Sequence, residues 1–343
     1  MIITKAPLRV SFLGGGTDYP EYFVEEGGAV LATAINRYVY INANQFASKL
    51  FDHSIRISYR KTEMVGGLDE IEHIPFRESL RHCGIEKDIE VGHFADLPAF
   101  TGLGSSSAFT VCLLQALHAF CGRHRSGLDL AYEAIRLERH VFKDCVGCQD
   151  QVLAAVGGLN FIEFRAEDNI VVHRLSLSPT RIQELENHLV LFFSGLRRSA
   201  SEVAQKQVRR VNENRGALRE MRVLAERGWN ILEGGRPLAD FGELLDHAWK
   251  LKRSLDDGVS SPEIDRLYDN ARVAGALGGK LLGAGGGGFL LLYVPPERLP
   301  KVRAALNGSA VELHVSLAAP GSHIVYSDGA AQAVPELAFA EHA

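Results

Sequence analysis

The stretch that decides the fold is Pro98-Ala-Phe-Thr-Gly-Leu-Gly-Ser-Ser-Ser-Ala108. Its glycines let the backbone come close to a ligand and point successive N–H groups toward one spot. The run 108–120 (AFTVCLLQALHAF) is apolar on nearly every side, which predicts a fully buried helix. The serines open this helix, whose N-terminus has unpaired donors and a partial positive charge. We therefore expect an anion site, most naturally for phosphates, rather than an ordinary loop whose serines cap a helix.

Two other nucleotide-binding patterns do not fit the chain. A P-loop needs G-x-x-x-x-G-K-[ST], but Gly279-Lys280 is followed by Leu281, and Ala274 stands at the first required glycine. Residues 283–288 (GAGGGG) match G-x-G-x-x-G. The strand-like sequence FLLLYV follows them, whereas a dinucleotide fingerprint opens a helix. Protein-kinase signatures are absent as well.

Three segments together resemble the signature motifs of the GHMP kinase superfamily, which includes galactokinase, homoserine kinase and mevalonate kinase. They are residues 5–19 (KAPLRVSFLGGGTDY), 98–108 and 280–289 (KLLGAGGGGF), in that order over nearly the whole chain. The resemblance implies an α+β fold of two domains, with ATP between them. The N-terminal domain would resemble ribosomal protein S5 domain 2, and the C-terminal domain would be ferredoxin-like. The nucleotide-binding residues implied are Gly102, Leu103, Gly104, Ser105, Ser106, Ser107, Gly285 and Gly286.

The pattern along the chain agrees with two α+β domains. Residues 1–60 are β-rich, residues 195–275 are mainly helical, and the chain then alternates again. We expect domains at 1–175 and 176–330 and an Ala-rich tail at 331–343. Further elements are expected as strands at 87–94, 159–164, 310–316 and 323–326 and as helices at 128–143 and 296–306.

Gly147-Cys-Gln-Asp-Gln151 resembles the galactokinase segment whose aspartate is the catalytic base. The resemblance implies that role for Asp150, and it implies that Arg9 pairs with Asp150 and with the transferring phosphate. Phosphoryl transfer needs positioned reactants, cations on the phosphate oxygens and often a carboxylate that receives the acceptor proton. An arginine partner would keep that carboxylate ionised. The alternative for Asp150 is an aspartate that caps a helix.

Glu138 falls on the apolar face of the expected helix 128–143. A carboxylate there is costly unless it is paired or bound to a metal. Some mevalonate-kinase-like relatives hold Mg²⁺ with a glutamate at about this distance before the catalytic aspartate and with a serine of the phosphate loop. The resemblance therefore implies Glu138 and Ser106 as metal ligands. The alternative is a buried ion pair with Arg139 or Arg136.

Gly14-Gly-Gly-Thr-Asp-Tyr19 stands where galactokinase reads Gly-Glu-His-Thr-Asp-Tyr. The resemblance implies that Asp18 bonds sugar hydroxyls. Gly15 replaces a glutamate that lies by the far end of a hexose, and the loss of its bulk and charge would admit a longer sugar with a phosphate. The substrate-binding residues implied in this loop are Gly14, Gly15, Thr17 and Asp18.

The loop 193–200 (FSGLRRSA) contains adjacent arginines, Arg197 and Arg198. Arginine forks suit phosphate, although a solvated basic turn is the alternative. With the run 14–23 (GGGTDYPEYF), this loop most resembles the D-glycero-D-manno-heptose 7-phosphate kinases. The reaction implied is transfer of the ATP γ-phosphate to the anomeric hydroxyl, which gives a 1,7-bisphosphate for capsule or surface-polysaccharide precursors. Another anomeric sugar kinase, such as a fucokinase, and a sugar sensor without turnover remain alternatives.

The composition agrees with an ordinary enzyme. The 343 residues are 46% hydrophobic and carry a net charge of −5, which argues against a protein that mainly coats nucleic acid. There is no signal-peptide pattern, and no apolar stretch approaches the roughly 20 residues of a membrane span. We expect a cytoplasmic enzyme that uses ATP, Mg²⁺ and a small sugar phosphate, without nucleic-acid or membrane partners. Its oligomeric state stays open, with a homodimer among the expectations.

The five cysteines are scattered through the chain, and an odd count without an export signal indicates reduced thiols. Cys145 and Cys148 form a single C-x-x-C. A zinc site would need a second pair or histidines at ligand spacing, and a redox motif would open a helix after a strand. Packing is therefore the favoured interpretation of this pair.

Overall fold

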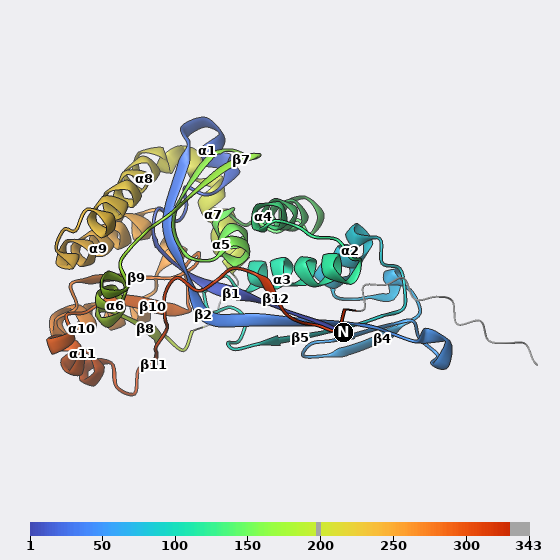
Figure 1. Cartoon of the computed structure of the whole chain (residues 1–343). Helices are drawn as coiled ribbons and strands as arrows, with labels where there is room; N and C mark the ends of the chain where they lie inside the picture. Colours follow the sequence, from blue (N-terminus) through green and yellow to red (C-terminus); the bar gives the residue numbers. More distant parts are fainter. Residues whose placement is uncertain (197–199, 330–343) are drawn as a thin grey trace, which may run out of the picture.

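The computed structural model describes residues 1–196 and 200–329, which form two β-sheets flanked by helices (Figure 1). The larger sheet has eight strands in the order β12-β1-β2-β5-β3-β4, with β6 paired to β2 and β7 paired to β6. The pair β3–β5 is parallel, and the other pairs are antiparallel. Its strands are β1 (Ile2–Leu13), β2 (Gly28–Gln45), β3 (Ile55–Ser58), β4 (Thr62–Val65), β5 (Ile89–Ala95), β6 (Leu159–Ala166), β7 (Asn169–Arg174) and β12 (His323–Ser327).

Helices α3 and α5 pack on β1 and β2, and α2 and α4 pack in turn against this pair of helices. In Figure 1 the four helices lie together along one side of the long strands. The helices of this part are α1 (Pro20–Glu26), α2 (Ile74–Cys83), α3 (Ser105–Phe120), α4 (Gly127–Arg136) and α5 (Gln149–Val156).

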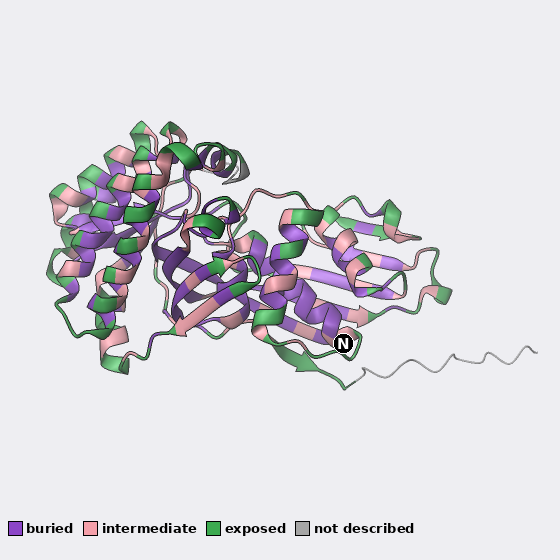
Figure 2. Cartoon of the chain, turned by 90° about the horizontal axis from the view of Figure 1, so that it is seen from above, coloured by how far each residue is buried: buried purple, intermediate pink, exposed green. Residues whose placement is uncertain are grey.

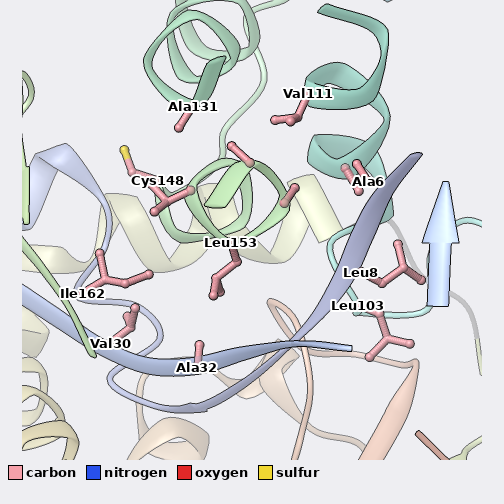
Figure 3. Packing of buried hydrophobic residues seen from close by; sticks show 14 of the residues in the cluster. Ala6, Leu8, Val30, Ala32, Leu103, Val111, Ala131, Cys148, Leu153 and Ile162 are labelled. Atoms are coloured by element: carbon pink, nitrogen blue, oxygen red, sulfur yellow. The ribbon is translucent and has the colours of Figure 1, made fainter. Parts of the chain in front are cut away.

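Helix α3 lies in the middle of this layer. All its residues from Ser107 to His118 are buried, which confirms the fully buried helix predicted from an apolar run without a polar face. In Figure 2 the buried residues gather in the interior, and the outer helices carry exposed residues on their outward faces. Figure 3 shows Val111 of this helix with Leu153 of α5 and Leu8 of β1 in one core. Cys148 belongs to the same core, which supports the packing interpretation for this residue, whereas Cys145 is only partly buried.

The smaller sheet has four strands in the order β11-β8-β10-β9, and each pair is antiparallel. Numbered among themselves these strands run 4-1-3-2, the order of a ferredoxin-like sheet, so that the predicted α+β fold class is confirmed. The strands are β8 (Leu189–Phe193), β9 (Gly278–Leu281), β10 (Phe289–Tyr293) and β11 (Val311–Leu313). The helices of this part are α6 (Pro179–His188), α7 (Ala200–Arg209), α8 (Val211–Glu233), α9 (Leu238–Ser254), α10 (Pro262–Ala274) and α11 (Leu299–Leu306).

Helices α8 and α9 join the two sheets. Helix α8 packs on β1, β2 and β6, and α9 packs on β9 and β1. A Cβ added at Gly228 of α8 would lie 2.3 Å from a methyl carbon of Leu13, so this crossing has no room for a side chain. After completing the smaller sheet the chain returns to the larger one, because β12 pairs with β1. The predicted second domain, 176–330, therefore contributes one strand to the first sheet.

One observed helix differs from its prediction, and the difference includes Glu138, a predicted site residue. The helix expected at 128–143 is α4 up to Arg136, and a π-helical turn follows at Leu137–Val141. Helices α2 and α6 were not expected, because their short amphipathic segments lie between stronger strand patterns. In the described ranges no helix has the length and apolar character needed to cross a membrane.

Candidate active site

A cavity of about 370 Å³ opens between the two sheets. One wall comes from the first sheet and its helices, through the loop after β1, the loop before α3 and the segment before α5. The opposite wall comes from α7, α9, β9 and the glycine-rich loop after β9. Segments that are far apart in sequence, including all three motif segments, thus contribute to one cavity.

The loop before α3 presents the start of this buried helix to the cavity. Gly104 is the N-cap residue, with a φ of +74° that favours glycine, and no side chain caps the helix. Ser105, Ser106 and Ser107 form the first turn and line the cavity. A first turn without a side-chain cap leaves N–H donors for an anion, so the serine-capped alternative does not hold.

Leu103 was predicted to bind nucleotide, and the structure places its side chain away from the cavity. Its side chain is fully buried in the core with Leu8, as Figure 3 shows, and is not part of the described cavity lining. Its carbonyl accepts a hydrogen bond of 3.0 Å from the backbone N–H of Arg9. Leu103 therefore anchors the phosphate loop to β1.

Arg9 and Asp150 form a bidentate pair at the base of the cavity. Arg9 Nε and Nη2 each donate to one Asp150 carboxylate oxygen at 2.6 Å, so the predicted pairing is confirmed. Arg9 Nη1 donates to the carbonyl of Gly102 at 2.6 Å. A Cβ added at Gly104 would lie 3.1 Å from Asp150 Oδ2, so the carboxylate lies directly beside the start of α3. The pair is thus held against the phosphate loop.

Asp150 does not act as a helix cap. It is the second residue of α5, whose N-cap residue is Cys148 and has no side-chain cap bond. Both carboxylate oxygens of Asp150 instead accept from Arg9. The capping alternative is therefore not what the structure supports.

Asp18, predicted to bind sugar hydroxyls, is buried and lines the cavity. Its two oxygens accept from the backbone N–H groups of Gly16 at 2.9 Å and Gln149 at 3.3 Å. Burial is the main cause that raises the pKa of Asp18, and these two backbone donors oppose it. A Cβ at Gly147 would lie 2.1 Å from Asp18 Oδ2, so the carboxylate packs directly against the Gly147 backbone, with no room for a side chain there.

The other predicted residues of this loop divide into two groups. Gly15 lines the cavity, as predicted. Gly14 and Thr17 are not part of the described lining, and Thr17 is fully buried. The Thr17 hydroxyl donates to the carbonyls of Gly14 and Ala29 at 2.8 and 2.9 Å. These two residues therefore shape the loop, because their polar groups are used within it.

Glu138 lies in the π-helical turn and is buried, with 1% of its surface exposed. Its Oε2 accepts from Ser107 Oγ at 2.9 Å and from Gln151 Nε2 at 2.5 Å. Its Oε1 has no hydrogen bond of good geometry among the described residues. Burial raises the pKa of Glu138 to about 7, and the hydroxyl of Thr110 opposes this rise together with Ser107 and Gln151.

Arg139 instead binds Glu21 and the carbonyl of Val146, and Arg136 is exposed. Among the described residues neither arginine forms the ion pair with Glu138 that was the alternative.

The phosphate-loop serine that touches Glu138 is Ser107, whereas Ser106 was expected to share an ion with it. Ser106 is exposed at the cavity, and Ser107 is buried behind it. Because Ser106 and Ser107 follow each other on one helical turn, they point in different directions. Glu138 is thereby linked to the loop through Ser107, and it is not part of the described cavity lining.

The glycine-rich loop 283–288 supports the phosphate loop from the second sheet. Gly283 and Ala284 line the cavity. Gly285 and Gly286, the residues predicted to bind nucleotide, instead face Val259, to whose carbonyl the Gly286 N–H donates at 3.0 Å. The two predicted glycines therefore hold the loop in place rather than line the cavity.

Two buried lysines of the second wall were missed by sequence reasoning. Lys252 of α9 and Lys280 of β9 are 5% and 2% exposed, and both line the cavity. Lys280 was noted within its motif, but no role was assigned to it. Lys252 follows Phe241, Leu245 and Ala248 at helical spacing, on the buried face of α9. That periodicity was the available signal. Arg197 and Arg198 lie outside the described residues.

Comparisons with known proteins agree with this arrangement. Residues 74–158 match the GHMP kinases N terminal domain, and residues 229–312 match the GHMP kinases C terminal domain. The chain has the two domains of a GHMP kinase. GHMP kinases use ATP, for which the loop before α3 offers a phosphate site.

Three relatives indicate the kind of acceptor. A D-glycero-alpha-D-manno-heptose 7-phosphate kinase of Campylobacter jejuni is 29% identical, over 89% of this chain and 93% of the relative. A bifunctional fucokinase/GDP-fucose pyrophosphorylase of Arabidopsis thaliana is 27% identical, over 89% of this chain and 31% of the relative. The crystal structure of a D-glycero-D-manno-heptose 1-phosphate kinase from Bacteroides thetaiotaomicron has a TM-score of 0.77 at 25% identity, over 95% of this chain and 100% of that chain. These relatives support a GHMP kinase that phosphorylates a sugar or a sugar phosphate.

Proposed function

We propose that this GHMP kinase transfers the γ-phosphate of ATP to the anomeric hydroxyl of D-glycero-D-manno-heptose 7-phosphate. The product would be the 1,7-bisphosphate, a precursor for capsule or surface-polysaccharide synthesis. The observation that carries the kinase chemistry is the bidentate Arg9–Asp150 pair, with both bonds at 2.6 Å, beside the uncapped first turn of α3. The heptose phosphate is supported by the Campylobacter relative and by the glycine at position 15.

Asp150 is the proposed acceptor of the proton. The anomeric hydroxyl is more acidic than other sugar hydroxyls, so a modest carboxylate base suffices. The oxygen of the anomeric hydroxyl bonds to the γ-phosphorus, and the bond between that phosphorus and the bridging oxygen of ADP breaks. The proton of the hydroxyl passes to Asp150. Arg9 orients the carboxylate for that step through its two hydrogen bonds. The backbone donors of residues 105–107 hold the phosphates in position.

Magnesium is the proposed cofactor, with Glu138 and Ser106 as its ligands. The buried Oε1 of Glu138, without a hydrogen bond of good geometry among the described residues, fits a divalent cation, because carboxylate and hydroxyl oxygens are ligands that Mg²⁺ accepts. When bound, such an ion neutralises charge on the phosphate oxygens. Ser107 and Gln151 orient the carboxylate through its other oxygen.

The substrate loop leaves space in the cavity at the far end of the sugar. Asp18 is the proposed ligand of sugar hydroxyls, and Gly15 leaves the cavity without the side chain that galactokinase has there. The distal phosphate is assigned to Arg197 or Arg198, on the resemblance of their loop to the heptose phosphate kinases. We propose further that Gly14 and Thr17 serve substrate binding by shaping this loop. Gly285 and Gly286 would serve nucleotide binding in the same indirect way.

The position of phosphate transfer tests the proposal directly. The protein is incubated with ATP, Mg²⁺ and D-glycero-D-manno-heptose 7-phosphate, and ³¹P NMR follows the products. We expect a new resonance coupled to the anomeric proton, with the 7-phosphate signal retained. The fucokinase relative makes L-fucose the comparison substrate. Faster turnover of L-fucose, or no product from the heptose phosphate, would contradict the proposed substrate.

A further inference from the structure

Lys252 is the buried cation of the cavity that the proposed mechanism does not use. It lies near the end of α9, with 5% of its surface exposed, and its Nζ donates to the carbonyl of Gly283. Within the ranges the structure describes, it forms no ion pair with a carboxylate. An ammonium group has three N–H donors, so the Gly283 carbonyl leaves two of them without an assigned acceptor.

The surroundings of Lys252 place it at the phosphate end of the cavity. A Cβ on Gly283 would lie 2.8 Å from the Cα of Gly102, the first residue of the phosphate loop. Arg9, whose guanidinium donates to the Gly102 carbonyl, is the charged group that most affects the pKa of Lys252 after burial. Asp150 acts on it as well, from α5. The ammonium group thus lies across from the Arg9–Asp150 pair, on the wall made by the second sheet.

Lys252 and its neighbour Lys280 differ in their ability to carry charge. Burial holds the pKa of Lys280 well below its ordinary range, and the charge of Lys252 lowers it further. The Nζ of Lys280 already donates to the carbonyl of Phe12 at 3.1 Å. Burial lowers the pKa of Lys252 to about 8, so that Lys252 remains mostly protonated at neutral pH. Of the two lysines, Lys252 is the one that brings a positive charge to the cavity.

From this geometry we infer that Lys252 binds the phosphoryl group that is transferred, opposite Arg9, so that the second sheet supplies a cation to the transfer site. A buried ammonium group with open donors is stabilised by an anion. During the transfer the phosphoryl group lies between the phosphate loop and Asp150, where Arg9 and Lys252 both face it. Charge that is placed in advance for the transition state speeds phosphoryl transfer. The inference rests on the proposed kinase function and adds one residue to it.

The test compares Lys252→Met, which keeps the length of the side chain without its charge, with Lys252→Arg. Lys250→Met is the matched control, since Lys250 is on the same helix but its side chain is 65% exposed. Turnover is measured with ATP and heptose 7-phosphate. Affinity for ADP is measured by calorimetry with and without aluminium fluoride, which mimics the transferring phosphoryl group.

We expect Lys252→Met to lower kcat about 100- to 1000-fold, the range for loss of one transition-state donor. Its affinity for ADP should stay within about twofold, whereas the gain in affinity from aluminium fluoride should be lost. Lys252→Arg should recover part of kcat and part of the affinity gain from aluminium fluoride. Lys250→Met should match the wild type in both quantities. Wild-type kcat in Lys252→Met overturns the inference. So does an equal loss of ADP affinity and melting temperature that arginine does not restore, because it shows that the lysine only holds Gly283.

A pH profile adds a readout that a structural role would not move. The groups that face Lys252 are Arg9 on β1, Asp18 after β1, Asp150 on α5 and Lys280 on β9. Because the pKa of Lys252 is lowered, its charge is present below about pH 8 and lost above it. We expect kcat/KM for ATP to fall above pH 8 in the wild type and not in Lys252→Arg. The same fall in both overturns the inference. A wild type that neither turns over any sugar nor gains affinity from aluminium fluoride overturns the proposed function itself.

Discussion

Gly283 lies directly on Gly102: a Cβ added at Gly283 would lie 2.8 Å from the Gly102 Cα. Both residues have a φ of +78°, a conformation that favours glycine. A Cβ at Gly288 would likewise lie 2.5 Å from the carbonyl oxygen of Thr101. The phosphate loop of the first sheet and the glycine-rich loop of the second therefore touch by backbone alone, which fixes the width of the cavity between them.

Gly283→Ala should separate these loops. The added methyl group cannot fit against Gly102, so we expect at least about a tenfold increase in KM for ATP and a loss of roughly 1–3 kcal/mol in stability from overpacking. Gly308→Ala is the matched control, because its φ is +74° with no atom within 4 Å of the new Cβ. It should cost only the backbone strain, about 1 kcal/mol, and leave KM unchanged. Equal effects of the two variants on KM would show that the loop contact is not required.

Glu138→Gln should raise the Mg²⁺ concentration that gives half-maximal activity by about tenfold or more, because it removes a proposed ligand. Ser106→Ala should shift it in the same direction. Activity is titrated with Mg²⁺ at saturating ATP. A variant with unchanged Mg²⁺ dependence and a lower melting temperature would show that Glu138 is structural.

The same substitution changes how stability depends on pH. Burial raises the folded-state pKa of Glu138 to about 7 from 4.5, so the metal-free folded protein binds a proton that the unfolded chain has lost. Stability should therefore fall as pH rises from about 4.5 to 7 and stay level above that range. In Glu138→Gln this fall should be absent, and at pH 8 the metal-free variant should melt higher than the wild type. Parallel melting curves from pH 5 to 8 for both proteins would contradict this.

Gly15→Glu should act against a phosphorylated sugar. Its Cβ would lie 3.1 Å from Ser11 Oγ, a contact that a small shift relieves, and its φ does not require glycine. The new carboxylate would enter the cavity beside Asp18 and repel an anionic substrate. We expect the factor by which kcat/KM falls to be more than ten times larger for heptose 7-phosphate than for the plain heptose. Gly15→Gln, with the same size and no charge, should be milder, and equal effects of the two would leave bulk as the only cause.

Arg197→Ala and Arg198→Ala are made separately, so that the effect of each arginine on the distal phosphate is measured alone. One charge-assisted contact contributes roughly 1.5–3 kcal/mol, so loss of the arginine that binds the phosphate should lower kcat/KM for heptose 7-phosphate about 10- to 150-fold. The plain heptose should be far less affected. If neither variant alters the ratio of the kcat/KM values for the two substrates, the distal phosphate is bound elsewhere.

Local sequence predicted the parts of the site that depend on local chemistry. The glycines and serines of 102–107 predicted a phosphate loop that opens a buried helix, because backbone freedom and apolar patterning are properties of short segments. The pairing of Arg9 with Asp150 joins residues 141 positions apart, and only the family resemblance predicted it.

The remaining differences arise from tertiary packing. Glu138 lies in the π-helical turn at Leu137–Val141 and bonds Ser107, which is buried, whereas Ser106 is exposed at the cavity. Thr17 was expected to face the substrate, but its hydroxyl bonds the carbonyls of Gly14 in the loop and Ala29 in β2. Lys252 lies in a charged segment, and although its spacing places it on the buried face of α9, the packing of α9 on β9 and β1 is what brings it to the cavity.

Asp150→Asn isolates the proposed chemical step, since asparagine keeps the shape of the side chain but cannot accept the proton. We expect kcat to fall about 10²- to 10⁴-fold while ATP binding stays nearly intact. Near-wild-type turnover in this variant would contradict the role of the base.

The most direct measurement is the steady-state release of ADP by the wild-type protein on D-glycero-D-manno-heptose 7-phosphate and on the unphosphorylated heptose, with Asp150→Asn as the blank. The predicted result is a kcat/KM for the 7-phosphate at least about tenfold above that for the plain sugar, because the distal phosphate adds at least one charge-assisted contact. The variant should bring both rates close to background. Equal kcat/KM values for the two sugars would contradict the heptose-phosphate assignment, and ADP release from neither sugar, or release that persists in Asp150→Asn, would contradict the proposed reaction.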